Sequence, residues 1–120
     1  MTKIALVDDD SSIRKAVGRL LRSNGYQCTV YESAEAALAD PALREMSCLL
    51  IDVELPGISG FDLQDRLRGL GSTVPHIFVT AHSEADCPDW EARLGDSPYL
   101  TKPVEELLLL STIEKVLFSW

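Results

Sequence analysis

Carboxylates, a hydroxyl and an amine recur in this sequence beside short apolar segments. Three consecutive aspartates at residues 8–10 follow KIALV, Asp52 ends CLLID, Thr80 follows HIFV, and Lys102 follows YLT. Carboxylates that are held close together raise each other's pKa unless a cation lies between them. Carboxylate oxygens suit Mg²⁺, which also binds substrate phosphates, and a lysine can pair with a phosphoryl group. These residue types therefore suit a metal ion and a phosphoryl group, if the fold brings them together.

Taken singly, each of these residues has an ordinary structural explanation. An aspartate after a strand is usually a turn or helix-cap residue, and Thr80 suits a strand because it is β-branched. Tyr99 suits the core or a sheet edge, and His76 and His82 have the character of surface or loop residues. The functional interpretation depends on whether the fold gathers the polar residues in one place.

Short apolar segments alternate with helical patterns along the chain. The predicted strands are residues 3–7, 26–32, 48–52, 76–81 and 99–101. The predicted helices are residues 11–25, 33–46, 61–71, 88–95 and 104–120. Ser11 or Ser12 can cap the first helix, and Pro41 interrupts the second because proline has no N–H to donate. The short fourth helix begins near Pro88, which a first turn tolerates, and ends by Gly95.

Strands that alternate with helices predict a parallel sheet with right-handed crossovers. The middle strands are continuous apolar runs, as expected when helices cover both faces of the sheet. The carboxyl ends of such strands form one edge, and ligands bind there near the point where the strand order reverses. We therefore predict one α/β domain over residues 1–120, with the polar residues gathered at this edge.

The composition favours a soluble protein. The 120 residues are 46% hydrophobic, which is enough for a core, and the net charge is −8. Phosphate contacts need basic patches, and no Lys/Arg cluster rises above the acidic background, so direct nucleic-acid binding is not expected. The three cysteines form no disulfide or zinc pattern, and no apolar run has the length of a signal peptide or membrane span. We expect a cytoplasmic protein with reduced thiols and no membrane contact.

Four motifs follow the predicted strands in order. They are VDDD with Asp8 and Asp9, DVELPGISG with Asp52, VTA with Thr80, and YLTKP with Tyr99 and Lys102. Pro56 and Gly60 lie four and eight residues beyond Asp52. Thr80 and Lys102 are 22 residues apart. With these motifs, the whole chain resembles the CheY-like receiver domain of two-component response regulators. The resemblance implies a doubly wound (βα)5 flavodoxin-like domain with a five-stranded parallel sheet, strand order 2-1-3-4-5 and helices on both faces.

The resemblance also assigns roles to the residues of the site. It implies that Asp52 is the nucleophile that accepts a phosphoryl group from a phosphohistidine on a sensor histidine kinase. Mg²⁺ would be held by Asp9, Asp52 and the backbone carbonyl of Glu54, with Asp8 acting through a water molecule. Lys102 would contact a phosphoryl oxygen.

In this family a hydroxyl and an aromatic residue relay phosphorylation to the surface. Thr80 would hydrogen-bond a phosphoryl oxygen and move toward the site, and Tyr99 would then turn into the space that Thr80 leaves. The Lys102–Pro103 peptide bond would be cis, an isomer that is common only before proline. Glu54 occupies a position that tunes the lifetime of the phosphoryl group, and the sequence leaves the direction of its effect open.

The sequence departs from the family pattern before the last strand. Gly95 and Asp96 stand where the family usually has Gly-Ala, and Pro88 lies upstream, so the fourth helix is expected to be short or displaced. This helix, the last strand and the last helix form the usual output and dimerisation face of the family. The standard dimer geometry is therefore in doubt.

The last predicted helix is apolar on two sides. One side carries Leu109, Leu110, Ile113, Val116, Leu117 and Trp120. The other carries Val104, Leu107, Leu108 and Phe118. Two interpretations of the second side stay open. It meets a partner, either another copy or an effector domain, or its first residues, Val104 and Leu107, pack under the loop after the last strand.

We expect a phosphorylation-activated signalling switch that catalyses only its own phosphorylation and dephosphorylation. Related receivers often precede a DNA-binding domain, so control of transcription through an attached or partner domain is expected. One alternative is a Mg²⁺-dependent phosphatase with an aspartyl nucleophile, although such enzymes usually carry an Asp-x-Asp motif after the first strand. Another is a stand-alone receiver that acts as a phosphate shuttle. A degenerate receiver that only binds partners would lack an acidic residue or the lysine, and none is missing.

Overall fold

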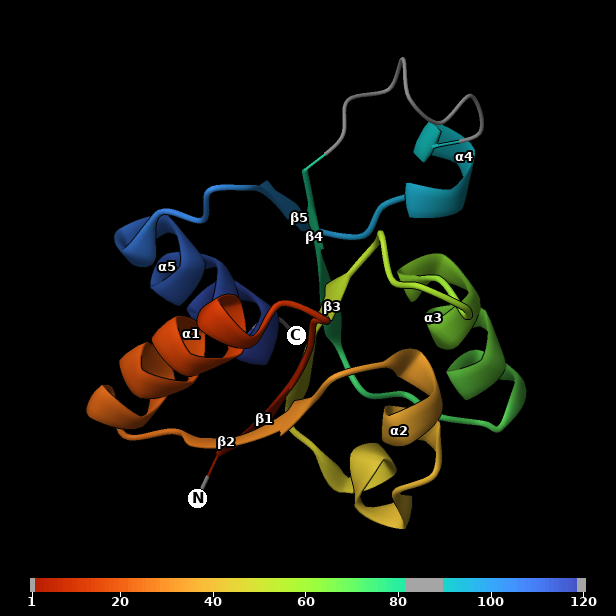
Figure 1. Ribbon diagram of the computed structural model, residues 1–120, viewed down its shortest axis with the longest axis horizontal. Coiled ribbons are helices and arrows are strands. Elements are labelled where there is room, and N and C mark those ends of the chain that lie inside the picture. The colour runs from red at the N-terminus through yellow and green to blue at the C-terminus, as the bar shows by residue number, and fades with distance from the viewer. Residues whose placement is uncertain (1, 82–89, 119–120) are drawn as a thin grey trace.

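The computed structural model describes residues 2–81 and 90–118, which form a β-sheet with helices on both faces (Figure 1). The strands are β1 (Lys3–Val7), β2 (Gln27–Tyr31), β3 (Cys48–Asp52), β4 (His76–Thr80) and β5 (Tyr99–Thr101). The helices are α1 (Ser11–Ser23), α2 (Ala34–Leu38), the 3₁₀ helix η1 (Pro41–Glu45), α3 (Gly60–Gly69), α4 (Trp90–Leu94) and α5 (Glu106–Leu117). Strands and helices alternate as predicted.

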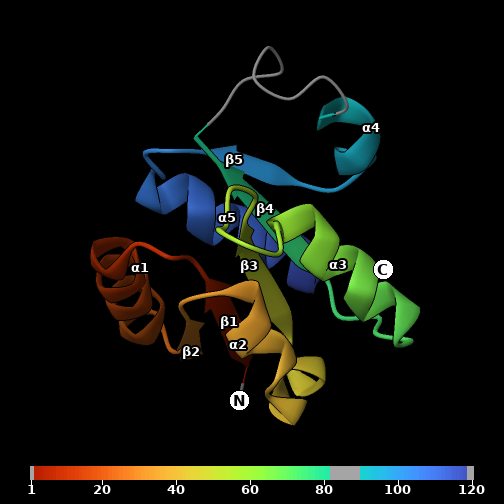
Figure 2. The same ribbon diagram turned by 45° about the vertical axis from the view of Figure 1, so that its right-hand side comes forward.

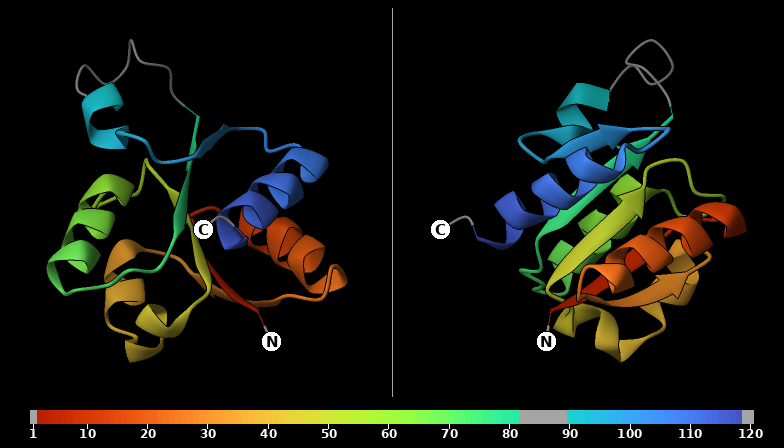
Figure 3. Two further views of the ribbon diagram at one scale, coloured as in Figure 1. Left: turned by 180° about the vertical axis from the view of Figure 1, so that it is seen from behind. Right: turned by 90° about the vertical axis from the view of Figure 1, so that its left-hand side faces the viewer.

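The five strands are parallel and lie in the order β2-β1-β3-β4-β5, which confirms the predicted doubly wound fold. β1 pairs with both β2 and β3, so the strand order reverses between β1 and β3. Figures 1 and 3 show α1 and α5 on one face of the sheet and α2, α3 and α4 on the other. Asp8 directly follows β1 and Asp52 ends β3, so these carboxylates lie at the point where ligands bind in such sheets.

β3 contributes to the core on both faces of the sheet. Leu49 and Ile51 pack in the cluster under α2 and α3, whereas Cys48 and Leu50 pack in the cluster under α1 and α5. Successive residues of a strand point to opposite faces, so a strand that is covered on both faces needs an unbroken apolar run. Burying each leucine or isoleucine stabilises the fold by about 1.5–3 kcal/mol. Asp52 is the one charged residue of the strand.

The start of α1 differs from the prediction, because Asp10 and not a serine is its N-cap. The Asp10 carboxylate accepts hydrogen bonds from the backbone N–H groups of Ser12, at 2.9 Å, and Ile13, at 3.4 Å. These bonds satisfy N–H groups that have no partner inside the helix. The Ser12 hydroxyl also donates to the Asp10 carboxylate, at 2.6 Å, and this bond, followed by the backbone bonds, holds the pKa of the Asp10 carboxyl below its usual value. The third aspartate of VDDD therefore orients α1.

The predicted break near Pro41 is confirmed. α2 ends at Leu38, and the separate 3₁₀ helix η1 begins at Pro41. α4 falls within the predicted short helix, and its last residue, Leu94, precedes Gly95, which has a φ of 58°. Pro88 lies outside the described residues. α4 lies above α3 in Figures 1 and 2.

α5 begins two residues later than predicted because Glu105 is its N-cap. The Glu105 carboxylate accepts hydrogen bonds from the backbone N–H of Leu107, at 3.1 Å, and of Leu108, at 2.8 Å. A carboxylate at this position also interacts favourably with the positive end of the helix dipole. The cap therefore fixes the direction in which α5 leaves the edge of the sheet.

The two apolar sides of α5 have different surroundings. Leu109 and Ile113 are buried, and Val104 is partly buried against the same cluster. Leu107 was expected to pack beside Val104 in one of the two interpretations, but 74% of its surface is exposed. The exposed large apolar residues of this helix and its C-cap are Leu107, Leu108 and Phe118. Trp120 lies outside the described residues.

Within residues 2–81 and 90–118, no helix combines the length and apolar character that a membrane crossing requires.

Candidate functional site

The carboxyl ends of β1 and β3 bring three aspartates together. Asp8 and Asp52 are 1% and 2% exposed, whereas Asp9 is exposed. Each of the three residues offers a carboxylate oxygen, and these oxygens all lie within 4.8 Å of one another. An all-oxygen donor set of this kind, with two members buried, could hold a hard divalent cation. The structure therefore gathers Asp8, Asp9 and Asp52 as predicted.

The loop after β3 and the start of α3 fix the position of Asp52. The Gly60 N–H donates to the Val53 carbonyl at 3.0 Å, and Ser59 caps α3 by accepting from the Asp62 N–H at 3.1 Å. A β-carbon on Gly60 would lie 2.3 Å from the backbone oxygen of Asp52, which is closer than any real contact. Only glycine lets α3 begin directly against the strand end that carries Asp52.

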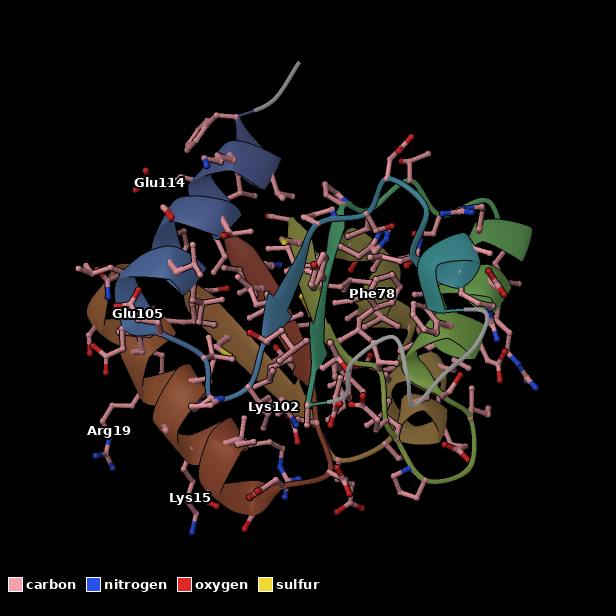
Figure 4. The ribbon with its side chains drawn as sticks, turned by 90° about the horizontal axis from the view of Figure 1, so that it is seen from above. Lys15, Arg19, Phe78, Lys102, Glu105 and Glu114 are labelled. Carbon is pink, nitrogen blue, oxygen red and sulfur yellow. The ribbon has the colours of Figure 1, made fainter. Side chains whose placement is uncertain are left out.

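Lys102 reaches the aspartates from β5, on the far side of β4. Its Nζ lies 3.0 Å from Oδ2 of Asp52 and 3.2 Å from Oδ2 of Asp8. The Lys102 backbone N–H donates to the Thr80 carbonyl at 2.9 Å, and the Lys102–Pro103 peptide bond is cis, as the resemblance implied. Figure 4 shows Lys102 near the middle of the molecule. The structure thus brings the predicted lysine to two of the predicted carboxylates.

The site has more negative charge than one ammonium can neutralise. Burial raises the pKa of the Asp52 carboxyl to about 7; the charge of Asp8 and a contact with Glu54 add to this rise, and Lys102 opposes it. Burial lowers the pKa of the Lys102 ammonium, but its bonds and charge interactions with Asp52 and Asp8 outweigh burial and raise this pKa overall. Both directions are expected when one cation faces two buried carboxylates. A divalent cation would offset the remaining charge, so the donor set fits a metal ion.

Thr80 and Glu54 are joined by a contact that the sequence did not predict. Thr80 is buried at the end of β4, and its Oγ1 donates a hydrogen bond to Oε1 of Glu54. The Ala81 N–H lies 3.4 Å from Oε2 of the same carboxylate. The Glu54 N–H donates to Oδ1 of Asp52 at 3.0 Å, which holds residue 54 beside that carboxylate. The side chain of Glu54 therefore turns toward the predicted switch hydroxyl.

Tyr99 and His76 are two further residues whose positions the sequence analysis considered. Tyr99 is paired with Phe78 in the β4–β5 register, and 45% of its surface is exposed, so its ring is not turned into the core here. His76 is half-buried, in contrast to the expected surface or loop position. Its Nε2 lies 2.7 Å from the Ser97 hydroxyl, its ring packs edge-on against Phe78, and burial lowers its pKa. His82 lies outside the described residues.

A basic groove on α1 was missed by the sequence analysis. α1 carries four of the 11 Lys and Arg residues and no acidic residue, so the rest of the chain has a net charge of −8 − 4 = −12. The groove is lined by Ser11, Arg14, Lys15, Arg19, Arg22, Ser23 and Val30. Arg14 also donates to the Asp8 carbonyl at 2.8 Å, which places the groove beside the acidic site. Figure 4 shows Lys15 and Arg19 pointing outward from α1.

The sequence matches the response regulator receiver domain family over residues 4–114. The chain therefore belongs to this family, the receiver domains of two-component systems.

Full-length regulators are among its relatives. Response regulator protein TmoT of Ectopseudomonas mendocina is 35% identical over 114 residues, which cover 95% of this chain and 52% of TmoT. Transcriptional regulatory protein FixJ of Bradyrhizobium diazoefficiens is 32% identical over 115 residues, which cover 95% of this chain and 56% of FixJ. The chain spans about half the length of these relatives.

Solved structures with the same fold include two receiver proteins. The response regulator receiver protein of Burkholderia phymatum is 37% identical, with a TM-score of 0.79 over 98% of this chain and 95% of that one. The CheY-like response regulator receiver domain protein of Methanospirillum hungatei JF-1 is 26% identical, with a TM-score of 0.84 over 98% and 94% of the two chains.

Proposed function

We propose that this chain is a phosphorylation-activated signalling switch whose phosphoacceptor is Asp52. One observation carries the proposal: the buried Asp52 carboxylate lies 3.0 Å from the Lys102 ammonium and within 4.8 Å of carboxylate oxygens of Asp8 and Asp9. A carboxylate that is fixed in position beside a positive charge can act as an oxygen nucleophile. The phosphoryl donor is a phosphohistidine on a sensor histidine kinase.

The transfer exchanges one bond to phosphorus for another. An Asp52 oxygen attacks the phosphorus, the O–P bond forms as the P–N bond of the phosphohistidine breaks, and the departing imidazole nitrogen keeps the electron pair. Lys102 then pairs with a phosphoryl oxygen, because its ammonium already lies beside the attacking carboxylate. Thr80, at the end of the adjacent strand, donates its hydroxyl to another phosphoryl oxygen.

The acidic cluster supports binding of Mg²⁺. Asp9, Asp52 and the backbone carbonyl of Glu54 would hold the ion, and Asp8 would act through a water molecule. Burial is the main cause of the raised pKa of Asp52, and the neighbouring charge of Asp8 adds to the rise; a bound cation would offset both effects, which supports this assignment. When bound, Mg²⁺ supplies positive charge that neutralises the oxygens of the transferring phosphoryl group.

The change at Asp52 passes through Thr80 and Tyr99 to the face formed by α4, β5 and α5. β4 and β5 are paired from Phe78–Tyr99 to Thr80–Thr101, so a displacement of Thr80 would also displace β5, the strand that carries Tyr99. Leu107, Leu108 and Phe118 are exposed on α5 and its C-cap, and they would meet a second copy or an effector domain. Because FixJ is a transcriptional regulatory protein about twice the length of this chain, the proposed output is control of transcription.

The basic groove on α1 is the proposed contact for the kinase. It lies beside the acidic site through Arg14 and carries positive charge on an otherwise acidic chain. Opposite charges on the kinase would speed encounter and orient the phosphohistidine toward Asp52.

Acetyl phosphate and Mg²⁺, followed by intact-mass measurement, test the proposal. The expected result is one phosphoryl adduct on the wild-type chain and none on Asp52→Asn. Absence of an adduct under all conditions would overturn the proposal. Rapid turnover of many phosphate esters would favour the phosphatase alternative.

A further inference from the structure

The Glu54 side chain occupies two hydrogen-bond donors at the end of β4, the strand that pairs with β3 beside Asp52. One is the Thr80 hydroxyl, which donates to Oε1, and the other is the Ala81 N–H, which lies 3.4 Å from Oε2. A hydroxyl and a backbone N–H at adjacent residues form a small anion-binding slot. We propose that the Glu54 carboxylate is an internal substitute for the phosphoryl group, bound in this slot until phosphorylation of Asp52 displaces it. The inference rests on the proposed phosphorylation of Asp52.

The register of the sheet explains why Glu54 reaches this slot. Asp52 is opposite Val79 in the β3–β4 pairing, and the Val53 N–H continues that pairing by donating to the Val79 carbonyl at 2.9 Å. Residue 54 is therefore level with the residues that follow Val79. The bond from its N–H to Asp52 holds the backbone there, and the side chain crosses from the end of β3 to the end of β4.

The negative charges at this edge of the sheet indicate that the contact of Glu54 with Thr80 and Ala81 is specific. Asp8, Asp52 and Glu54 are all acidic, so a Glu54 carboxylate drawn toward the site is repelled by its neighbours. Glu54 is only partly buried, and solvent was available to it as an alternative. The two donors therefore outweigh the repulsion. A phosphoryl group on Asp52 presents more negative charge and stronger acceptors to the same donors, and it also repels Glu54 directly.

Competition for one slot predicts a slower entry of the phosphoryl group. Thr80 and Ala81 can bind a phosphoryl oxygen only after they have released the Glu54 carboxylate. Removing the carboxylate leaves both donors ready for the incoming group. Glu54→Ala is therefore expected to raise the rate of labelling by acetyl phosphate about tenfold, the effect of losing one hydrogen bond to a charged group. Glu54→Gln, which keeps an acceptor without the charge, is expected to fall between the two.

Two controls separate this effect from a general loss of negative charge. Glu45→Ala removes an exposed carboxylate from η1, which precedes the opposite end of β3, and is expected to label at the wild-type rate. Thr80→Ala removes one donor of the slot, so Glu54→Ala in that background is expected to give little further acceleration. The inference would be overturned if Glu54→Ala did not raise the labelling rate, or raised it equally in the wild-type and Thr80→Ala backgrounds. Labelling of the wild-type chain in the same experiment would still uphold the proposed function.

A second measurement needs no phosphoryl donor. The amide resonance of Ala81 is expected to shift in Glu54→Ala and to stay in place in Glu45→Ala, because the Glu54 carboxylate contacts that N–H and Glu45 lies on η1, before β3. An unchanged Ala81 resonance in Glu54→Ala would overturn the inference, whether or not Asp52 is phosphorylated. Failure of every variant to acquire an adduct would overturn the proposed function and, with it, the competition that the inference describes.

Discussion

The Lys102 ammonium lies 3.0 Å from the carboxylate of Asp52, although β4 separates the strands that lead to the two residues. The two residues are 50 positions apart in the sequence and come from strands that do not pair with each other. Asp8 adds a second buried carboxylate to the same ammonium, at 3.2 Å. This cation is therefore the main compensation for two charges that burial would otherwise make costly.

Lys102→Met is expected to destabilise the protein at pH 8 without divalent cations. Breaking a fully buried ion pair costs about 3–5 kcal/mol, and we expect about 2 kcal/mol here because Lys102 keeps some solvent contact. Urea unfolding followed by circular dichroism measures the change. Mg²⁺ is expected to restore part of the loss. Lys115→Met, which removes an exposed cation from α5, is the matched control, and equal stability of the two variants would contradict the prediction.

Asp52 is expected to make stability fall as the pH rises. Its pKa is about 7 in the folded protein and near 3.8 in the unfolded chain, so the folded state binds more protons between these values. The free energy of unfolding then decreases with rising pH across this window, by about 1.4 kcal/mol for each pKa unit. Asp52→Asn removes this dependence, so its stability relative to wild type is expected to be greater at pH 8 than at pH 5.

The comparison needs urea titrations of both proteins at the two pH values in the presence of a chelator. His76 has a lowered pKa, so it favours stability as the pH rises toward and above 6.5, but it does so in both proteins and cancels in the difference. Lys102 has a raised pKa and titrates only above this window. An equal stability difference at pH 5 and pH 8 would show that Asp52 does not titrate as described.

The parallel sheet and the acidic cluster were predictable from local sequence, whereas the strand order came from the resemblance to receiver domains. The run CLLID can be buried on both faces only in a covered parallel sheet, and Asp52 at its end must then lie at the ligand-binding edge. Asp8 and Lys102 occupy equivalent places after their own strands. Strand order and motif spacing fix these positions before any side-chain packing is considered.

Other features depend on side-chain choices that a sequence does not determine. Glu54 can extend to solvent or cross to Thr80, and the choice depends on the β3–β4 register and on local donors. The groove on α1 was missed because a net charge of −8 hides four cations that helical spacing places together. Asp10, and not a serine, caps α1 because its carboxylate accepts hydrogen bonds from two backbone N–H groups at once.

Gly60→Ala is expected to destabilise the protein and to displace Asp52. The new β-carbon would lie 2.3 Å from the Asp52 carbonyl oxygen and 2.9 Å from Cγ2 of Ile51, so β3 and α3 must separate. Overpacking of this kind costs about 1–3 kcal/mol, and labelling by acetyl phosphate is expected to slow as well. Gly69→Ala is the control, because nothing lies within 4 Å of its β-carbon and alanine favours helix. Similar stabilities for the two variants would contradict the close approach at Gly60.

Reversing charge on α1 is expected to slow transfer from a kinase without affecting small donors. In Lys15→Glu/Arg19→Glu, two outward-pointing cations of the basic groove become anions, and transfer from a phosphorylated kinase that labels the wild-type chain is expected to fall about tenfold at low salt. The difference should shrink as salt rises, because screening weakens interactions between exposed charges. Lys3→Glu/Lys115→Glu makes the same change in net charge at other exposed positions. If this control slows kinase transfer equally, total charge and not the groove on α1 governs the encounter.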